Sequence, residues 1–209
     1  YDIAPPGPGD VLINEFLYNP ADELSEYVEL YNPTSHAFDL SGWTLNDATG
    51  RLRQLTYGNQ QPLFKPESFI VLAPDSSILE LNGQASLQVM GSRFPALNQG
   101  GDAIVLRDSA GVKLDSLYYS SQWGDGTQAL ERQYTGLSAV YRQNWATGFG
   151  SQIGTPGLPN NKIPPDTLGP ELEQISWADS VTIRLIFSEA LIKESMEDLN
   201  NYTITPHRP

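Results

Sequence analysis

Short runs of alternating apolar and polar residues follow one another along the first 155 residues, and turn residues separate them. Asn-Pro follows two of the runs, at Asn19 and Asn32, and NDATG or DSAG follows others. No run repeats apolar residues at three and four positions over a helix length, so the pattern predicts an all-β body. Many short strands at this spacing are typical of a β-sandwich. The runs are VLINEFLY (11–18), YVELY (27–31), WTL (43–45), FIVLA (69–73), LQVM (87–90), AIVLR (103–107), VKLDSLYY (112–119) and ALERQY (129–134).

The alternation also predicts which side chains face the core. In EYVELYN, Val28 and Leu30 lie on one strand face, and Tyr27, Glu29 and Tyr31 lie on the other. We therefore expect Glu29 to lie outside the core. The predicted core contains Val28, Leu30, Leu40, Trp43, Leu45, Val71, Ile104 and Leu106.

Glu15 falls on a strand face that also carries Val11, Ile13 and Leu17. A carboxylate buried there needs a partner to offset its desolvation. Arg132 is the partner we expect, because a guanidinium can bind both carboxylate oxygens. The alternative is a catalytic acid with a raised pKa, but no second acid lies at a suitable spacing. A structural Glu15–Arg132 pair is the favoured interpretation.

Proline-rich segments divide the chain. Residues 155–170 carry five prolines in sixteen positions, which removes amide donors and favours an extended linker. Residues 1–9, with APPGPG, are expected to be a similar linker. This division predicts a sandwich over residues 10–154 and a second β unit over residues 171–209.

Composition and charge exclude several classes of function. The 25 acidic and 12 basic residues give a net charge of −13, so the average surface repels nucleic acid. No run reaches the roughly 18–20 apolar residues of a membrane span, and the N-terminus lacks the features of a signal peptide. The absence of cysteine excludes disulfides and cysteine-ligated zinc.

Common catalytic motifs do not occur in this sequence. It has no G-x-S-x-G elbow, P-loop, H-E-x-x-H motif or twelve-residue calcium loop. Its two histidines, His36 and His207, are 171 positions apart, which argues against a two-histidine metal site. Ser35, His36 and Asp39 fall within one turn and cannot converge as a catalytic triad. We expect a solvated turn there.

Two binding functions stay open. Loops at one end of a sandwich can bring oxygen ligands together for calcium, although loop acids commonly serve solubility and turn formation instead. The candidate calcium ligands are Asp22, Glu23, Glu26, Asp47 and Asp125. Exposed aromatic rings can stack on sugars, although core packing is the competing interpretation. The rings considered are Tyr118, Tyr119, Trp123, Tyr134, Tyr141 and Trp145.

Six segments, in order, resemble the lamin tail domain family in its bacterial form. They are INEFLYNP (13–20), EYVELYNP (26–33), FDLSGWTLND (38–47), LNQGGDAIVLRDSAGVKLDSLYY (97–119), ALER (129–132) and GTPGLPN (154–160). The resemblance covers about residues 10–160 and implies an immunoglobulin-like two-sheet β-sandwich without an assigned catalytic activity. It also implies an inter-strand connection in which Leu40 and Trp43 pack inward and Gly42 adopts a backbone conformation that side chains resist.

The chain departs from the nuclear members of that family. It has no heptad rod, basic localisation run or lipidation box, and it is strongly acidic. Filament, chromatin and DNA roles are therefore not carried over. Similarity to the bacterial members implies a secreted or cell-surface modular protein, in which any enzyme would lie in a flanking domain.

The tail is similar to the opening part of immunoglobulin-like domains of the bacterial surface-layer type. In VTIRLIF, Val181, Ile183, Leu185 and Phe187 lie on one strand face. About 40 residues cannot close a sandwich, so we expect a partial domain whose apolar face needs a cover. A dimer through the tail is one possible cover.

Three functional hypotheses follow. The favoured one is a non-catalytic protein-interaction or spacer module, without a cofactor, in an extracellular or cell-surface bacterial protein. Its partner would be an unidentified protein or extracellular glycan. The second is a carbohydrate- or calcium-binding accessory module. The third is a glycoside hydrolase that uses Glu15 and another acid, which would require two carboxylates across a cleft.

Overall fold

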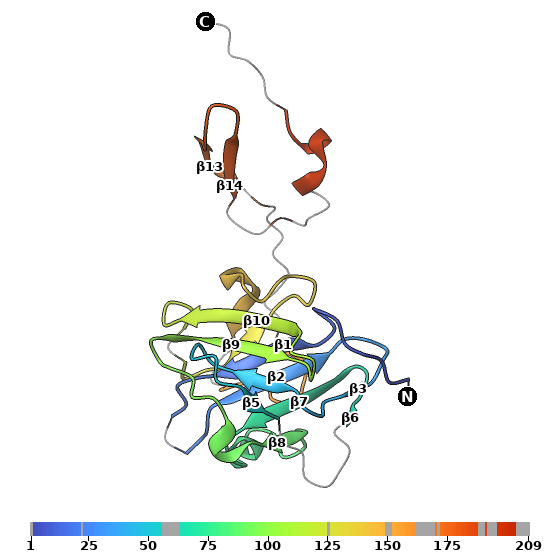
Figure 1. Cartoon of the computed structure of the whole chain (residues 1–209). Coiled ribbons are helices and arrows are strands. Elements are labelled where there is room, and N and C mark those ends of the chain that lie inside the picture. Colours follow the sequence, from blue (N-terminus) through green and yellow to red (C-terminus); the bar gives the residue numbers. More distant parts are fainter. Residues whose placement is uncertain are drawn as a thin grey trace, which may run out of the picture. The chain divides into compact units, whose positions relative to one another are not determined.

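The computed structural model describes residues 2–21, 23–55, 63–124, 126–148, 152–161, 170, 172–187, 191 and 196–203. The chain divides into two compact units, Tyr1–Ile163 and Pro164–Pro209. The first unit is a β-sandwich with one sheet layered on another (Figure 1). None of the helices in the described part of the chain is long and apolar enough to cross a bilayer.

A six-stranded and a four-stranded sheet form the two layers. The larger sheet has the order β12-β11-β1-β2-β7-β8 and is antiparallel except between β7 and β8. Its strands are β12 (Trp145–Thr147), β11 (Leu130–Arg132), β1 (Leu12–Leu17), β2 (Tyr27–Asn32), β7 (Ser68–Ala73) and β8 (Leu87–Val89). The smaller sheet, in its spatial order, contains β10 (Lys113–Ser120), β9 (Gly101–Arg107), β4 (Thr44–Asn46) and β5 (Arg53–Gln54).

Short elements complete the first unit. A two-stranded ladder pairs β3 (Phe38–Asp39) with β6 (Leu63–Phe64). Among the described residues of this unit, three short 3-10 helices lie in connections: η1 (Ser77–Glu80), η2 (Gly91–Arg93) and η3 (Arg142–Asn144). Residues 2–9, part of the segment expected to be a linker, contact the body at two points: Ile3 bridges Ala37, and the Gly9 amide donates to the Leu114 carbonyl.

Apolar side chains between the two sheets form the main core. All eight residues predicted to be in the core are buried, but only seven lie between the sheets, because Val71 belongs to a second cluster on the outer face of the larger sheet. Trp43 is 1% exposed, and its ring centroid lies 6.4 Å from that of Phe38. The preceding Gly42 adopts φ +76°, a left-handed conformation that L side chains rarely adopt, as the resemblance implies. His36 is half-exposed and approaches Asp2 at the surface.

The outer face of the larger sheet is also buried, and this overturns the expectation for Glu29. Val28 and Leu30 do face the core between the sheets, and Glu29 points the opposite way. That opposite face carries a second apolar cluster and is covered by other segments of the chain, so Glu29 is fully buried. The cluster contains Leu17, Tyr27, Val71, Ala73, Ile78 and Ala129.

A β-bulge in β1 changes the face on which Glu15 lies. The register of β1 against β2 shifts between Ile13 and Glu15. Ile13 and Phe16 belong to the main core, whereas Leu17 belongs to the outer cluster. Because the extra residue interrupts the alternation, Glu15 shares the outer face with Leu17 rather than the inner face with Ile13.

The second unit contains a β-hairpin of β13 (Leu172–Trp177) and β14 (Ile183–Phe187) and a short 3-10 helix, η4 (Leu199–Asn201). In β14, Ile183, Leu185 and Phe187 are partly buried, while Arg184 and Ile186 are exposed, so the predicted alternation holds within the strand. Val181 lies before the strand and is 88% exposed.

Candidate functional site

Three glutamates lie directly opposite one another on adjacent strands at the outer face of the larger sheet. Glu15 on β1 pairs in register with Glu131 on β11 and with Glu29 on β2. All three side chains are fully buried. We call them the glutamate row. Like charges at directly opposed positions are destabilising, so this arrangement requires compensating groups.

A segment near the end of the first unit supplies many of these groups. We call residues 152–161 the strap. Thr155 donates its amide and its hydroxyl to the two oxygens of Glu15, at 2.9 and 3.0 Å. The Gly157 amide donates to Glu29 Oε2, and the Asn161 amide donates to Glu131 Oε2. Backbone N–H groups of one segment therefore reach every member of the row.

Side-chain donors occupy the remaining carboxylate oxygens. The Tyr27 hydroxyl donates to Glu15 Oε1, where the Thr155 amide also binds. Asn14 Nδ2 donates to Glu29 Oε1 at 2.7 Å, and Asn161 Nδ2 reaches Glu131 Oε1 at 3.4 Å. Each oxygen of the three carboxyl groups thus accepts at least one hydrogen bond.

Asn14 and Asn160 connect the strap to β1 a second time. Asn14 Nδ2 donates to Asn160 Oδ1 at 2.8 Å, and Asn160 Nδ2 donates to the Asn14 carbonyl at 3.0 Å. Asn160 Nδ2 also reaches the Arg132 carbonyl at 2.9 Å. Asn14 lies beside Glu15 at the bulge, so the extra residue places two polar side chains on the strap side of β1.

Two strap glycines allow this close approach. A Cβ on Gly154 would collide with the Tyr27 hydroxyl and the Glu15 carboxyl group. Gly157 has φ +78°, and a Cβ there would lie 2.9 Å from the Ala85 Cα. A side chain at either position would displace the strap from the sheet.

Burial shifts the ionisation of the glutamate row. Desolvation, with a smaller contribution from the Glu131 charge, raises the pKa of Glu15 from 4.5 to about 7, against the lowering effect of the hydrogen bonds from Tyr27 and Thr155. Desolvation also raises the pKa of Glu29 well above its ordinary value, and the nearby Glu15 charge adds to this shift. The pKa of Glu131 is raised, again chiefly by burial. Among the described residues, no Lys or Arg forms an ion pair with the row.

This geometry serves binding within the chain rather than hydrolysis. A glycosidase needs two carboxyl groups that face a substrate across a cleft. Here the oxygens of Glu15, Glu29 and Glu131 face hydrogen-bond donors of the same chain, and their side chains are not accessible to solvent. The row therefore holds the strap against the sheet.

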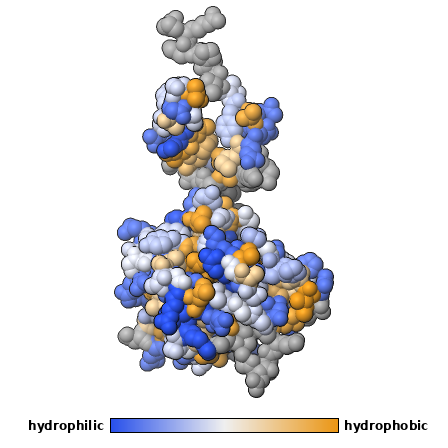
Figure 2. Space-filling model, viewed as in Figure 1, coloured by the Kyte–Doolittle hydropathy of each residue, from blue (hydrophilic) through white to orange (hydrophobic). Residues whose placement is uncertain are grey.

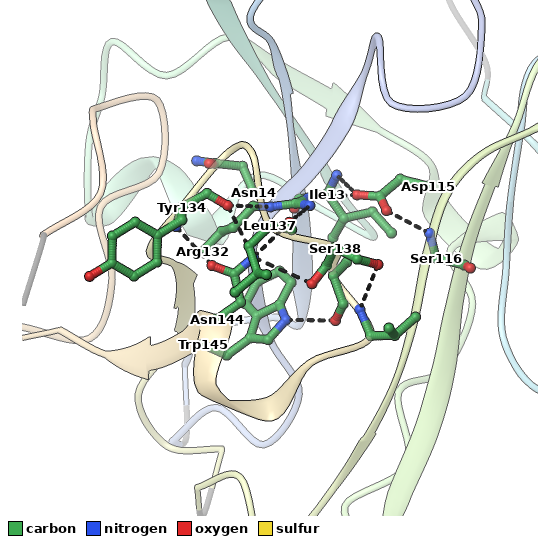
Figure 3. Close-up of polar contacts among 12 residues, drawn as sticks. Ile13, Asn14, Asp115, Ser116, Arg132, Tyr134, Leu137, Ser138, Asn144 and Trp145 are labelled. Carbon is green, nitrogen blue, oxygen red and sulfur yellow. Dashed lines mark hydrogen bonds and ion pairs between the residues drawn. The ribbon is translucent and has the colours of Figure 1, made fainter. Parts of the chain in front are cut away.

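Arg132 does not pair with Glu15, and that prediction was wrong. Arg132 and Glu131 are neighbours on β11 and point to opposite faces, so Arg132 lies on the side away from the row. Arg132 Nη1 lies 2.7 Å from Asp115 Oδ2 and 3.0 Å from the Ile13 carbonyl, and Nη2 donates to the Leu137 carbonyl at 2.7 Å (Figure 3). The role of Arg132 is structural, but its partner is Asp115.

The described calcium candidates have separate roles. Glu23 is exposed, Glu26 accepts the Leu97 amide at 3.1 Å, and Asp47 accepts the Thr49 amide at 2.8 Å. Asp22 and Asp125 lie outside the described residues. Within the described ranges, no group of three or more His, Cys, Asp or Glu side chains is arranged to hold a metal ion.

The aromatic candidates divide between core and surface. Tyr119 and Trp145 are fully buried and pack against Phe16, with ring centroids 5.1 Å from it in both cases. Trp123 is partly buried against the core, and Arg142 lies over its ring at 6.0 Å. The exposed rings are Tyr118, Tyr134 and Tyr141.

Sequence reasoning missed the strap residues, although it contained a signal for them. The prolines of residues 155–170 predict a linker, whereas residues 155–161 bind the sheet. Four of the six family-like segments converge at the site: INEF supplies Glu15, YVEL supplies Glu29, ALER supplies Glu131, and GTPGLPN supplies most of the strap. Their convergence could have been predicted only with the strand order known.

The fold and the site together define an immunoglobulin-like β-sandwich module whose buried acids bind its own chain. The sequence profile of the Lamin Tail Domain family matches residues 4–121, which is more than half of the 209 residues. The chain belongs to the lamin tail domain family. The matched range contains Glu15 and Glu29, whereas Glu131 and the strap follow it. A comparison with curated proteins gives no significant match.

Proposed function

We propose that this chain is a non-catalytic spacer and interaction module of an extracellular or cell-surface modular bacterial protein. The observation that carries the proposal is the anchoring of the strap to all three members of the glutamate row. The strap precedes the boundary between the two compact units, at residues 163 and 164. Anchoring it fixes where the chain leaves the sandwich.

Further hydrogen bonds support this anchoring role. The Ala129 amide donates to the Ile153 carbonyl at 2.6 Å, and Asn82 Nδ2 donates to the Pro156 carbonyl at 2.9 Å. The strap is thus attached by side chains and backbone from several parts of the sandwich. A spacer benefits from this design, because force on the following unit would act first on a segment bound at many points.

The extracellular setting is supported by composition and resemblance. The net charge of −13 favours a soluble surface that repels nucleic acid and anionic lipid. The bacterial members that the sequence resembles are modular secreted or surface proteins. An antibody raised against the first unit should bind intact cells of the source organism, whereas labelling only after lysis would contradict this localisation.

Amide hydrogen exchange tests the anchoring role. We expect the Gly157 and Asn161 amides to be protected to a degree similar to the β1 and β2 amides. Replacing Glu29 by Ala should release Gly157, and Glu131→Ala should release Asn161, while the β9 amides stay protected. Free exchange of both strap amides in the unmodified chain would contradict the proposal. Calorimetric titration with Ca²⁺ and with oligosaccharides tests the alternative binding functions, since saturable heat would favour one of them.

A further inference from the structure

The donors around the glutamate row differ in kind. Glu29 accepts from Asn14 Nδ2 and the Gly157 amide, and Glu131 accepts from the amide and the Nδ2 of Asn161. These nitrogens can only donate. A protonated carboxyl group at either position would turn its own hydrogen toward a second donor or lose one of these bonds.

The surroundings of Glu15 allow protonation. Its Oε2 faces the Thr155 hydroxyl at 3.0 Å, and its Oε1 faces the Tyr27 hydroxyl and the Thr155 amide. A hydroxyl can rotate and accept as well as donate. A neutral Glu15 can therefore donate from Oε2 to Thr155 Oγ1 while Oε1 keeps both of its donors.

The orientation of Asn14 supports this assignment. Asn160 Nδ2 lies near three carbonyl-type oxygens, those of the Asn14 main chain, the Asn14 side chain and the Arg132 main chain, at 3.0, 3.3 and 2.9 Å. Asn160 Oδ1 therefore faces Asn14 Nδ2, which fixes the Asn14 amide with Nδ2 toward Glu29. Glu29 consequently meets a donor on each of its oxygens.

We propose that Glu15 binds a structural proton, which makes the middle of the row a neutral carboxylic acid between two ionised neighbours, Glu29 and Glu131. One proton at this position removes both like-charge contacts of the row, because Glu15 is the register partner of each neighbour. A proton on Glu29 or Glu131 would remove only one such contact. It would also place the hydrogen of the carboxyl group against an N–H donor that cannot accept it.

The groups that face Glu15 are consistent with this proton. Tyr27 and Glu29 on β2 and Glu131 on β11 are the titratable ones, and the strap contributes Thr155, which does not titrate near neutral pH. Arg132 lies on the other sheet face with Asp115. Burial raises the pKa of Glu15 from 4.5 to about 7. Burial also raises that of Glu29, but the two amide donors of Glu29 favour the proton on Glu15.

The proton couples folding to pH with a definite sign. Between about pH 4.5 and pH 7 the folded chain holds a proton on Glu15 that the unfolded chain has lost. Stability from this group is complete at the lower end of that range and falls as the pH rises through it. Uptake of one proton on folding lowers the folding equilibrium constant by about tenfold for each pH unit within the range.

Two isosteric variants of the full chain test the proposal. Glu15→Gln reproduces the neutral acid, since its amide nitrogen can donate to Thr155 Oγ1 while its oxygen accepts from the Thr155 amide. Glu29→Gln is the matched control and places an amide donor against Gly157 N–H or Asn14 Nδ2. The folding equilibrium constant of each chain is measured by urea denaturation between pH 5 and pH 8.

We expect Glu15→Gln to reduce the number of protons taken up on folding by about one and to keep the folding constant at pH 8 within about threefold of the unmodified chain or above it. Glu29→Gln should lower the constant by roughly tenfold or more at every pH, because it leaves a buried donor unpaired. The reverse ranking, with Glu29→Gln tolerated and Glu15→Gln destabilising, would overturn the proposal. An unchanged proton uptake in Glu15→Gln would overturn it equally.

A direct measurement covers the case in which Glu15→Gln does not fold. In the unmodified chain, carboxyl ¹³C chemical shifts at pH 6 should show Glu15 protonated and both Glu29 and Glu131 ionised. An ionised Glu15 at this pH, or a proton resident on Glu29, refutes the assignment.

Discussion

Arg132 on β11 and Asp115 on β10 form a largely buried ion pair that joins the two sheets of the sandwich, with Arg132 Nη1 2.7 Å from Asp115 Oδ2. The same carboxylate oxygen accepts the Ile13 amide at 2.9 Å, so the pair also includes β1. Arg132 further donates to the carbonyls of Ile13, Tyr134 and Leu137 (Figure 3). A single guanidinium thus connects three strands and the connection that follows β11.

Replacing Arg132 by Met should destabilise the first unit by about 3–5 kcal/mol, because it leaves the largely buried Asp115 carboxylate without its cation. The lost donors to the buried carbonyls add to the effect. Urea denaturation of the full chain, followed by tryptophan fluorescence, measures the change.

Arg107→Met is the matched control for that substitution. Arg107 lies on β9, and its Nη1 donates to the exposed Gly111 carbonyl at 3.1 Å. We expect a change of about 0.5 kcal/mol or less, as for most surface substitutions. Equal losses for the two variants would show that the Arg132–Asp115 pair has no special role.

Gly154→Ala should loosen the strap. The new Cβ would collide with the Tyr27 hydroxyl and the Glu15 carboxyl group, so we expect a destabilisation of about 1–3 kcal/mol. Gly136→Ala is the control, because no atom lies within 4 Å of a Cβ there and its φ is not positive. Thermal unfolding of both variants checks the difference. A Gly154→Ala chain as stable as Gly136→Ala would mean that the strap does not pack as described.

Glu26, which directly precedes β2, should contribute a second pH dependence. Burial raises its pKa to about 7, the Leu97 amide opposes this shift, and the Asp102 charge adds to it. Because the folded-state pKa lies above the ordinary value of 4.5, the contribution of Glu26 to stability falls as the pH rises between those values. Glu26→Gln should therefore flatten the stability profile between about pH 5 and pH 7.

The exposed Glu80 provides a control with the same change of charge. Glu80→Gln should leave the pH profile unchanged. If Glu26→Gln and Glu80→Gln give the same profile, desolvation of Glu26 has no influence on stability in this range.

Alternation along strands was sufficient to predict the fold and much of the core. Val28 and Leu30 are buried as predicted, because regular strands place every second side chain on one face. The burial of Glu29 does not follow from the same rule. Alternation places the side chains of Glu29 and Val28 on different faces of the sheet. Only the path of the strap shows that the face carrying Glu29 is covered.

The glutamate row could not be predicted, for a related reason. A bulge in β1 moves Glu15 to the outer face, and nothing in VLINEFLY indicates a bulge. The row also depends on β11 lying beside β1, although the two strands are more than 100 residues apart in sequence. Proline content favoured a linker over residues 155–170, yet the glycines and asparagines of the strap support a docked segment.

The hairpin of the second unit presents an apolar face that should drive association between copies. Cross-strand partners Ile175 and Leu185, and Trp177 and Ile183, are in register, so their side chains share one face. Ile175 is 63% exposed and Trp177 is 72% exposed. Hydrophobic residues are accordingly visible at the surface of this unit (Figure 2).

An exposed apolar hairpin face favours pairing with another copy, as do the outer edges of β13 and β14, which pair with no further strand among the described residues. We expect the average mass from light scattering to increase with protein concentration, and Ile175→Ser with Trp177→Ser to suppress this increase. Val181→Ser is the control, since Val181 is 88% exposed but lies in the connection before β14, outside the paired face. Association that survives the double substitution, or that Val181→Ser abolishes equally, would remove the hairpin face from the explanation. A chain that stays monomeric at all concentrations would refute the dimer itself.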